Sequence, residues 1–537
     1  MFAATAKEVK TTVYNGDVTA SDKLGVINEN AIYNGKVTFT GNDGDGINIG
    51  ATAGNTASAR FNGDIKSNNI KLVGDATAYY ASNITMTGKD NDTTGTKING
   101  GTNIFEVSGN GENALLNTSN KVGETGTGVS ITNNSGVKLE ANIDKDTVID
   151  LGDKTNLNQN TVGLTENSDG FYELSKVDGT GNKYALNYKD NIASENGYSA
   201  ELNDVFAASQ VIHSKLNEFG YKTVDERAEV LDKYYSSNIY SETVKAAYDT
   251  VKMNEEAVLS LARKSEVGKW TAEGKALYSK DEYDRNGTVG DYSSEIESTG
   301  LMAAFGYGLN ETTTAGVAFS GVKQDVDTDG GSADADLFYL GLYGNKVVGN
   351  YDFTAGLGYQ FGEYEADNNI LTGTGDKYDS QTVSGYVQGR YTADLGDGLS
   401  VQPKVKLGYT YVKQDDAKDS YFGVEDAEIS TFDAEAGFDV VKSVQLEKSK
   451  VDVKFGASYI RTMGDTDEEF TGRFYGAKAS EGFNVLGAEL AENVVKFNLG
   501  AEVTNENGFF YNGGFTYEFG SNDTEVYGVN VGAGYKF

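Results

Sequence analysis

The sequence contains no cysteine, one proline and one histidine among its 537 residues. Without cysteine the chain forms neither disulfides nor thiolate metal sites. The single histidine, His213, has no second histidine beside which it could bind a metal and no suitable set of partners for a catalytic triad. We expect His213 to face a neighbouring helix or solvent, and these absences argue against enzymes that depend on thiolate or imidazole chemistry.

Basic residues are also scarce, because 45 Lys and Arg stand against 80 Asp and Glu and give a net charge of −35 at pH 7. A nucleic acid backbone would repel such a chain, so we expect no nucleic acid partner. No apolar run reaches the ~18 residues of a transmembrane helix, although membrane β-strands, which are half polar, stay possible. Residues 1–7 lack the basic and apolar parts of a secretory signal. If the protein is exported, we expect its signal and further passenger residues upstream of Met1.

Glycine and tyrosine are abundant, with 67 and 34 residues, and this composition favours β structure. From about residue 9 to 190 the chain is rich in Gly, Asn, Asp and Thr, with short β-branched runs such as residues 36–40, 103–107 and 136–140. Each run ends at turn residues, and no hairpin pattern links one run to the next. This pattern favours a right-handed parallel β-solenoid, with a two-sheet sandwich as the alternative.

Between residues 199 and 264 glycine nearly disappears and apolar residues recur at helical spacing. The spacing predicts a helix over residues 202–216 with Gly220 as its stop signal, and a second helix over residues 224–235. A third helix is predicted to begin at Ser241 and to end at residues 263–264. The middle of the chain is therefore expected to be a helical linker.

From residue 267 onward, about twelve runs alternate apolar and polar residues, which places their side chains on opposite faces of a strand. Runs of ten residues or so match a tilted membrane-spanning strand of about 9–11 residues, whereas ordinary strands have about five or six. The runs cover residues 270–278, 301–307, 313–322, 337–343, 353–361, 383–391, 401–411, 432–440, 453–459, 495–503, 509–519 and 527–537. They predict a transmembrane β-barrel rather than a soluble sandwich.

The predicted connections between these runs alternate short and long, except for the last at residues 520–524. Short turns on one side and long loops on the other are the plan of outer-membrane barrels. One long connection, residues 325–336, has Asp at the spacing of a calcium-binding loop, but strands are expected on both sides of it. We interpret it as an acidic extracellular loop with at most weak calcium binding, and we predict no metal site, no cofactor and no catalytic residues.

These features together resemble the type V secretion family, the autotransporters. The resemblance rests on residues 270–278, 331–343 and 398–409 and on the aromatic end Tyr535-Lys536-Phe537. It implies an all-β chain with a helical linker, in which a 12-stranded antiparallel transmembrane barrel follows a solenoid. The implied domains are a passenger remnant (residues 1–195), a linker with a pore helix (196–265) and the barrel (266–537).

The resemblance implies an outer-membrane translocator that exports and anchors its own passenger at the cell surface, the passenger being an adhesin with a role in virulence. The implied partners are outer-membrane lipid, a receptor on a host or bacterial surface, and the barrel-assembly machinery, which would recognise the final strand at Tyr535 and Phe537. A diffusion porin with an accessory domain is the alternative. An enzyme acting on polysaccharide is disfavoured, because Arg60 is the only arginine before the helices.

The third helix directly precedes the first barrel strand, so we expect it to enter the lumen. We then expect charged residues of the helix to meet charged residues of the wall. On the helix the candidates are Glu255, Glu256, Arg263 and Lys264. On the wall they are Glu273, Lys275, Arg390, Lys404, Lys406, Glu435, Lys496 and Glu502.

Overall fold

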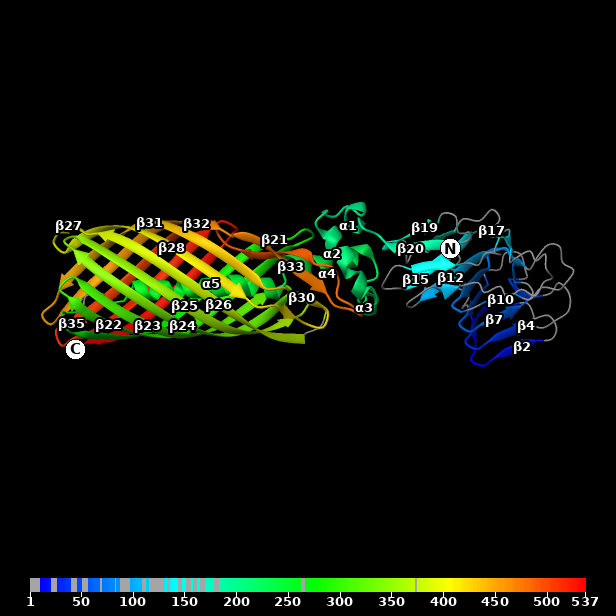
Figure 1. Cartoon of the computed structure of the whole chain (residues 1–537), viewed down its shortest axis with the longest axis horizontal. Helices are drawn as coiled ribbons and strands as arrows, with labels where there is room; N and C mark the ends of the chain where they lie inside the picture. The colour runs from blue at the N-terminus through cyan, green and yellow to red at the C-terminus, as the bar shows by residue number, and fades with distance from the viewer. Residues whose placement is uncertain are drawn as a thin grey trace, which may run out of the picture. The chain divides into compact units, whose positions relative to one another are not determined.

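A computed structural model shows two compact units, one of residues 1–196 and 209–227 and the other of residues 197–208 and 228–537 (Figure 1). None of the helices that the structure describes is long and apolar enough to cross a membrane. The described residues are 10–20, 27–39, 46–50, 57–67, 70–82, 84–86, 97–108, 113–114, 130–132, 136–142, 147–150, 156–157, 162–164, 170–177, 183–261, 266–371 and 374–537.

The first unit contains three sheets whose strands pair in parallel, which confirms the predicted parallel architecture. The largest sheet consists of β1 (Thr11–Tyr14), β3 (Asn30–Tyr33), β6 (Ser58–Phe61), β9 (Thr77–Tyr80), β12 (Thr102–Ser108), β15 (Gly136–Asn142) and β18 (Val162–Leu164). A second consists of β2 (Val18–Ala20), β4 (Val37–Phe39), β7 (Ile65–Ser67) and β10 (Ile84–Met86). The third consists of β5 (Ile47–Ile49), β8 (Ile70–Leu72), β11 (Lys97–Asn99), β14 (Ser130–Thr132) and β17 (Asn156–Leu157).

A column of aromatic rings runs through the first of these sheets. Parallel pairing in register places equivalent side chains directly above one another, so that the rings stack. Neighbouring ring centroids lie 4.7, 5.2, 5.9 and 5.0 Å apart. The column consists of Tyr14, Tyr33, Phe61, Tyr80 and Phe105. Each stacked pair stabilises the solenoid by about 0.5–1.5 kcal/mol beyond the burial of its surface.

A fourth, mixed sheet includes β13 (Asn113–Ala114), β16 (Thr147–Asp150), β19 (Tyr172–Lys176) and β20 (Lys183–Tyr188). In it β13 and β16 pair in parallel, while β20 pairs antiparallel with both β16 and β19. After it come α1 (Ile192–Glu195), α2 (Leu202–Ala208), η1 (Ser209–Ile212) and α3 (His213–Glu218). The prediction of one helix over residues 202–216 is therefore wrong. A tighter 3₁₀ turn interrupts it and buries both Ser209 and Ile212. The predicted stop is present, since Gly220 has a φ of +100°.

His213 lies buried among aromatic rings and beside a residue of the next helix, as expected for a structural histidine. Its Nδ1 lies 2.9 Å from Nη1 of Arg227, and because Arg is only a donor, Nδ1 accepts. Phe171, Tyr172 and Tyr188 approach the imidazole edge to face. Burial and the Arg227 charge lower the pKa of His213 to about 2, so the ring is neutral.

The second unit contains the predicted twelve-stranded antiparallel barrel, which is confirmed (Figure 1). Its strands are β21 (Trp270–Asn286), β22 (Asp291–Asn310), β23 (Thr313–Thr328), β24 (Gly331–Val348), β25 (Tyr351–Asn368), β26 (Thr374–Tyr391), β28 (Leu399–Gln414), β31 (Ala427–Gln445), β32 (Ser449–Gly464), β35 (Asn493–Asn505), β36 (Phe509–Gly520) and β37 (Glu525–Lys536). A short strand, β27 (Ala393–Gly396), follows β26 and pairs with β28. The first and last strands, β21 and β37, pair and close the sheet.

An apolar band marks where the barrel crosses the membrane. The outward face of β25 carries Tyr351, Phe353, Ala355, Leu357, Tyr359 and Phe361. Leu357, in the middle of this row, is 65% exposed. This stretch of about eleven residues fits the length of a tilted membrane-spanning strand. Beyond it the outward positions carry carboxylates instead of rings. The long strands β22 to β26, of 16–20 residues, therefore extend past the membrane on the side away from the chain's C-terminus, whereas β35, β36 and β37 have only 12–13 residues.

The prediction of long loops at several of these positions is therefore wrong. Residues 325–336 form strands β23 and β24 joined at Asp329-Gly330, not an acidic loop. Alternation continues there with inverted polarity, because charged side chains point outward while Val326, Tyr364 and Val412 are buried inside. The alternation of short and long connections is thus weaker than predicted. Long connections do exist, and they carry the four-stranded sheet of β29 (Ala417–Lys418), β30 (Phe422–Val424), β33 (Asp467–Phe474) and β34 (Phe483–Glu489).

Candidate functional site: a helix inside the barrel lumen

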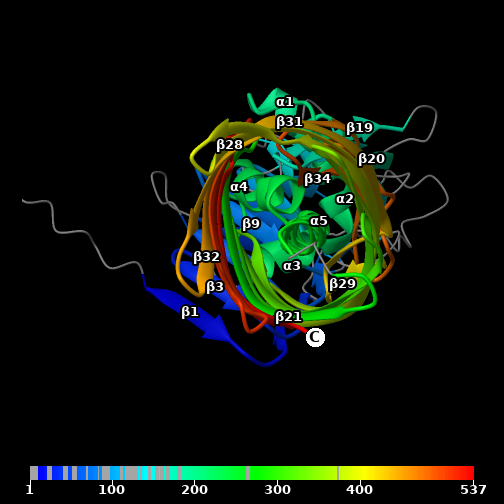
Figure 2. The same ribbon diagram turned by 90° about the vertical axis from the view of Figure 1, so that its left-hand side faces the viewer.

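The helix α5 (Ile239–Leu259) lies inside the barrel, as the view along the barrel axis shows (Figure 2). It follows α4 (Val224–Ser236), which matches the second predicted helix. α5 begins earlier than the predicted Ser241, because Asn238 caps it and accepts a hydrogen bond from the backbone N–H of Ser241 at 2.9 Å. Its 21 residues span about 32 Å, which is close to the ~30 Å of a bilayer's hydrocarbon core.

Most of α5 is buried, including charged residues on several sides. Buried polar groups need partners, so the barrel wall must supply them. At the end near the connections that carry β29–β34, Thr243 Oγ1 donates to Gln414 Oε1 at 2.8 Å. Two residues further, the Lys245 ammonium pairs with Asp249 on the helix at 2.7 Å and with Asp281 on β21.

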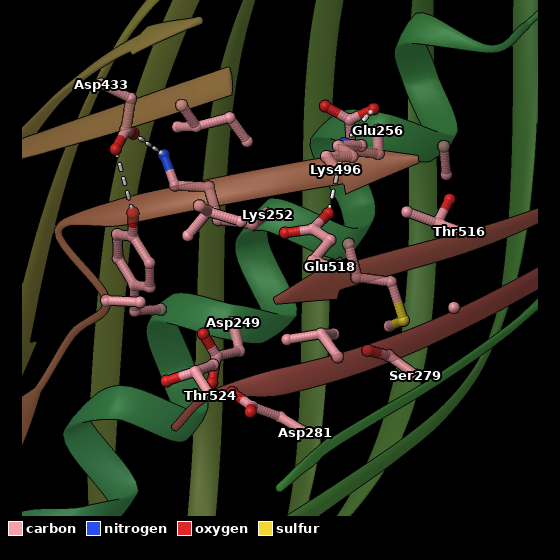
Figure 3. Close-up of a pocket in the computed structure, with 18 of the residues that line it drawn as sticks. Asp249, Lys252, Glu256, Ser279, Asp281, Asp433, Lys496, Thr516, Glu518 and Thr524 are labelled. Atoms are coloured by element: carbon pink, nitrogen blue, oxygen red, sulfur yellow. Dashed lines mark hydrogen bonds and ion pairs between the residues drawn. The ribbon is translucent and has the colours of Figure 1, made fainter. Parts of the chain in front are cut away.

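The middle of α5 is held by charged and amide groups of the wall. Lys252 Nζ lies 2.6 Å from Asp433 Oδ2 and donates to Thr410 Oγ1 at 2.6 Å. Tyr248 OH donates to the other oxygen of Asp433 at 3.2 Å (Figure 3). On another side of the helix, Gln360 Nε2 donates to the Ala247 carbonyl at 2.9 Å. Backbone and side chains of α5 are thus both bonded to the wall.

The end of α5 near the chain's C-terminus meets a cluster of lysines. Glu256 lies 2.8 Å from Lys406 Nζ and 3.0 Å from Lys496 Nζ, on opposite sides of the same carboxylate. Lys496 also pairs with Glu518 on β36 at 3.4 Å (Figure 3). Lys275 Nζ donates to Ser260 Oγ, just past the helix, at 2.6 Å.

A cavity of about 180 Å³ separates α5 from β35, β36 and β37 (Figure 3). Charged groups of both the helix and the wall line it, among them Asp249, Lys252, Glu256 and Lys496. On the opposite side, apolar residues Val251 and Val258 pack with Ala318 and Tyr339 of the wall. The helix therefore packs tightly on one side of the lumen and through charged groups on the other.

The predicted site residues divide into those that join helix and wall and those that do not. Glu256, Lys275, Lys406 and Lys496 join them. Lys404 and Glu435 pair with each other at 3.4 Å within the wall, and Glu435 lies 3.6 Å from Lys406. Glu273 pairs with Lys275 at 3.3 Å. These last contacts orient the lysines that reach the helix.

The remaining candidates do not connect helix and wall among the described residues. Glu255 is buried, but its nearest charged partner is Lys252 on the same helix at 3.8 Å, and neither of its oxygens accepts a hydrogen bond. Glu502 accepts from Thr504 of its own strand at 3.2 Å. Arg390 lies opposite Lys404 on the neighbouring strand, and its Nε has no hydrogen-bond partner. Arg263 and Lys264 lie outside the described residues.

Several residues with the strongest contacts are not among the predicted site residues. On α5 these are Lys245, Asp249 and Lys252. Their three- and four-residue spacing places them on one face of the helix, and this spacing is the signal by which the sequence could have predicted them. On the wall, Gln360 and Asp433 were missed. Gln360 carries no charge, and Asp433 is one of 80 acidic residues in this chain, so neither residue is singled out by the sequence.

Comparison with known proteins gives a match for the barrel. The model of the autotransporter beta-domain matches residues 274–516. A search of curated proteins finds no match. The translocator domain of the autotransporter NalP from Neisseria meningitidis is 14% identical over 56% of this chain and 100% of that chain, with a TM-score of 0.43. The transport unit of AIDA-I from Escherichia coli is 15% identical over 55% and 99%, with a TM-score of 0.41.

The family match falls on the twelve-stranded barrel whose outward faces carry the apolar band. Such a domain resides in the outer membrane, contacts membrane lipid, is not an enzyme and exports its passenger to the cell surface. The C-terminal part of the chain is therefore an autotransporter β-domain, which translocates the passenger.

Proposed function

We propose that α5 seals the translocator pore after the passenger has reached the surface. The supporting observation is the set of contacts at successive heights of the lumen: Lys245 with Asp281, Lys252 with Asp433, and Glu256 with Lys406 and Lys496. Breaking one buried pair leaves an unpaired charge, which costs about 3–5 kcal/mol. The helix would thus be held in place once these pairs have formed.

Conductance in planar bilayers tests this seal. Deletion of residues 239–259 should leave a barrel that still shifts its gel mobility on heating, and its single-channel conductance should rise severalfold. A porin with an accessory domain, the alternative expectation, would conduct equally with and without these residues. Equal conductance in the two proteins, with both barrels folded, would reject the seal.

We also propose that residues 1–195 are the end of an adhesive passenger, that residues 196–265 are its linker, and that it is not an enzyme. The extended parallel sheets support adhesion, because a solenoid presents a long, repeated surface to a receptor. Bacteria that display the full chain should bind host cells or one another more than bacteria displaying residues 196–537. Equal binding at equal surface amounts of barrel would reject the adhesin.

Assembly of the barrel is proposed to depend on its last strand, through recognition of Tyr535 and Phe537 by the barrel-assembly machinery. The Phe537 backbone exchanges two hydrogen bonds of 2.9 Å with Trp270, at the seam of the barrel. The Tyr535 ring lies 4.6 Å from that of Phe509 and 6.0 Å from that of Phe537. This aromatic group supports a recognition surface at the end of the chain.

A further inference from the structure

The cavity between α5 and strands β35, β36 and β37 has one end at which the charges do not balance. There the Lys245 ammonium pairs with two carboxylates, Asp249 of α5 at 2.7 Å and Asp281 of β21. Lys245 and Asp281 are each 2% exposed, so bulk water screens these charges little. One positive charge therefore faces two negative charges in a buried place, which we call the Asp281 end of the cavity.

The other charged residues that line the cavity balance one another. Three lysines face three carboxylates, at distances of 2.6, 2.8 and 3.4 Å. The pairs are Lys252 with Asp433, Lys406 with Glu256, and Lys496 with Glu518. Among the described residues that line the cavity, the surplus carboxylate is thus confined to the Asp281 end. A buried surplus charge is costly unless an ion of the opposite sign accompanies it.

Two oxygen atoms at the same end have no hydrogen-bond partner. They are Oδ1 of Asp281 and Oγ1 of Thr524, and both residues line the cavity. Thr524 is 6% exposed and directly precedes β37, the strand that pairs with β21. Figure 3 shows its side chain beside those of Asp249 and Asp281. Because buried polar atoms in proteins are nearly always bonded, these two oxygens indicate a ligand.

The chemistry of this end fits a small cation. Carboxylate and hydroxyl oxygens are the ligands that hard cations prefer. A monovalent ion balances the one surplus charge, whereas a divalent ion would leave a positive excess. Among the residues that the structure describes, no group of three or more carboxylate or histidine side chains could hold a metal ion, which also disfavours a divalent ion. The cavity of about 180 Å³ is far larger than the ~15 Å³ that holds one water molecule.

We propose that Asp249, Asp281 and Thr524 bind one monovalent cation, Na⁺ or K⁺, between α5 and the barrel wall. The Asp249 side chain is 24% exposed, which gives the ion access from solvent. The net charge of −35 raises the concentration of cations near the protein. The bound ion joins α5 to β21 and to the start of β37, the two strands that close the barrel. The sequence predicts no such site, because the three residues lie far apart in the chain.

Hydrogen exchange of the full-length protein in lipid vesicles tests the site, with KCl or NaCl compared with choline chloride at the same concentration. Choline is too large to replace the ion between two carboxylates. If the ion must leave before the helix opens, exchange slows by a factor of one plus the ratio of cation concentration to Kd. The amides of residues 245–249 should therefore exchange severalfold more slowly in K⁺ or Na⁺, and the effect should saturate.

Thr524→Val removes one oxygen ligand but keeps the shape and charge of the site, so most of the cation effect should disappear. Asp281→Asn, which removes the surplus charge, should abolish it. Thr516→Val is the matched control, since Thr516 lines the same cavity away from Asp281 (Figure 3). It should keep the full cation effect.

Equal exchange of the wild type in choline and in K⁺ or Na⁺ would overturn the cation site. An equal cation effect in Thr524→Val and Thr516→Val would do the same, because general screening would then explain it. Protection that follows pH but not the cation would also overturn it, since a proton shared by the two carboxylates would balance the charge. The site does not depend on whether α5 seals the pore, which the conductance experiment tests separately.

Discussion

The Asp433 carboxylate binds two residues of α5, with Lys252 at 2.6 Å and Tyr248 at 3.2 Å. Replacing Asp433 with Asn removes its charge and leaves the Lys252 ammonium without an anionic partner at this position. We expect the plug to be destabilised by about 2 kcal/mol, since Lys252 is partly exposed and can recruit water. Single-channel recordings should show frequent openings that the wild type lacks.

Asp426→Asn serves as the control for this experiment, because Asp426 is an exposed carboxylate whose nearest cation is Lys413 at 3.9 Å, outside the lumen. It should leave the closed state intact. Recordings of Asp433→Asn that match those of Asp426→Asn would show that this pair does not hold the helix.

His213 makes the stability of the first unit depend on pH. Its pKa is lowered from 6.5 to about 2 in the folded protein by burial and by Arg227, so the unfolded state binds a proton first as the pH falls. Stability is therefore full above pH 6.5 and decreases below it, by about 2 kcal/mol between pH 6.5 and pH 5.

Hydrogen exchange of residues 213–219 checks this dependence, with each observed rate compared with the intrinsic exchange rate at the same pH. Protection should fall from pH 7 to pH 5 in the wild type. It should fall less in His213→Gln, whose amide oxygen can still accept from Arg227 but cannot bind a proton. The same decrease in both proteins would assign the effect to other titrating groups.

For single residues, the sequence predicts which side chains face the lumen but not which of them contact α5. Alternation placed Lys406, Lys496 and Glu502 on the inner face alike, yet only the two lysines contact α5. The height of a residue along the barrel depends on strand register and tilt, which a single strand does not encode.

Among the elements, the aromatic column of the solenoid gives a direct comparison of two adjacent tyrosines. Tyr80 is 1% exposed and stacks between Phe61 and Phe105, whereas Tyr79 points to the outer face. Tyr80→Ala should destabilise the solenoid by about 3–5 kcal/mol, as expected for a large buried ring. Tyr79→Ala should cost about 1 kcal/mol or less.

Limited proteolysis of the passenger on intact cells measures this difference, since the barrel remains protected. Tyr80→Ala should be cut much faster than the wild type, and Tyr79→Ala at nearly the wild-type rate. Equal rates for the two variants would mean that the column does not govern the stability of the solenoid.

The elements that the sequence predicts best are those with one period throughout. The apolar band predicts the barrel strands, but not the parts of the strands beyond it, because charged side chains there occupy the outward positions and aromatic rings the inward ones. The helix over residues 202–216 was predicted unbroken, since its apolar spacing persists through the 3₁₀ turn at Ser209–Ile212. Periodicity alone shows neither where the apolar side chains of a strand change from the outward to the inward face nor where an α-helix gives way to a 3₁₀ turn.

At the scale of the whole molecule, closure of the barrel depends on the seam between β21 and β37, where Phe537 pairs with Trp270. Replacing Tyr535 and Phe537 with Ser should abolish most of the heat-modifiable protein in the outer-membrane fraction. Phe455→Ser, which removes an equally exposed ring from the middle of the barrel surface, should reduce it only slightly. Equal amounts of folded barrel in both variants would contradict the proposed assembly signal.

The part of the barrel above its apolar band has a further consequence. On the long strands β24, β25 and β26, about seven of the 18 residues lie beyond the band. At ~3.3 Å per residue and a tilt of about 40°, they raise this side of the exit by roughly 18 Å. That elevation carries an emerging polypeptide past the phosphates and inner sugars of the outer leaflet before it is released. The first solenoid rungs to leave the barrel can therefore fold in bulk water, where no lipid headgroup competes for their backbone amides.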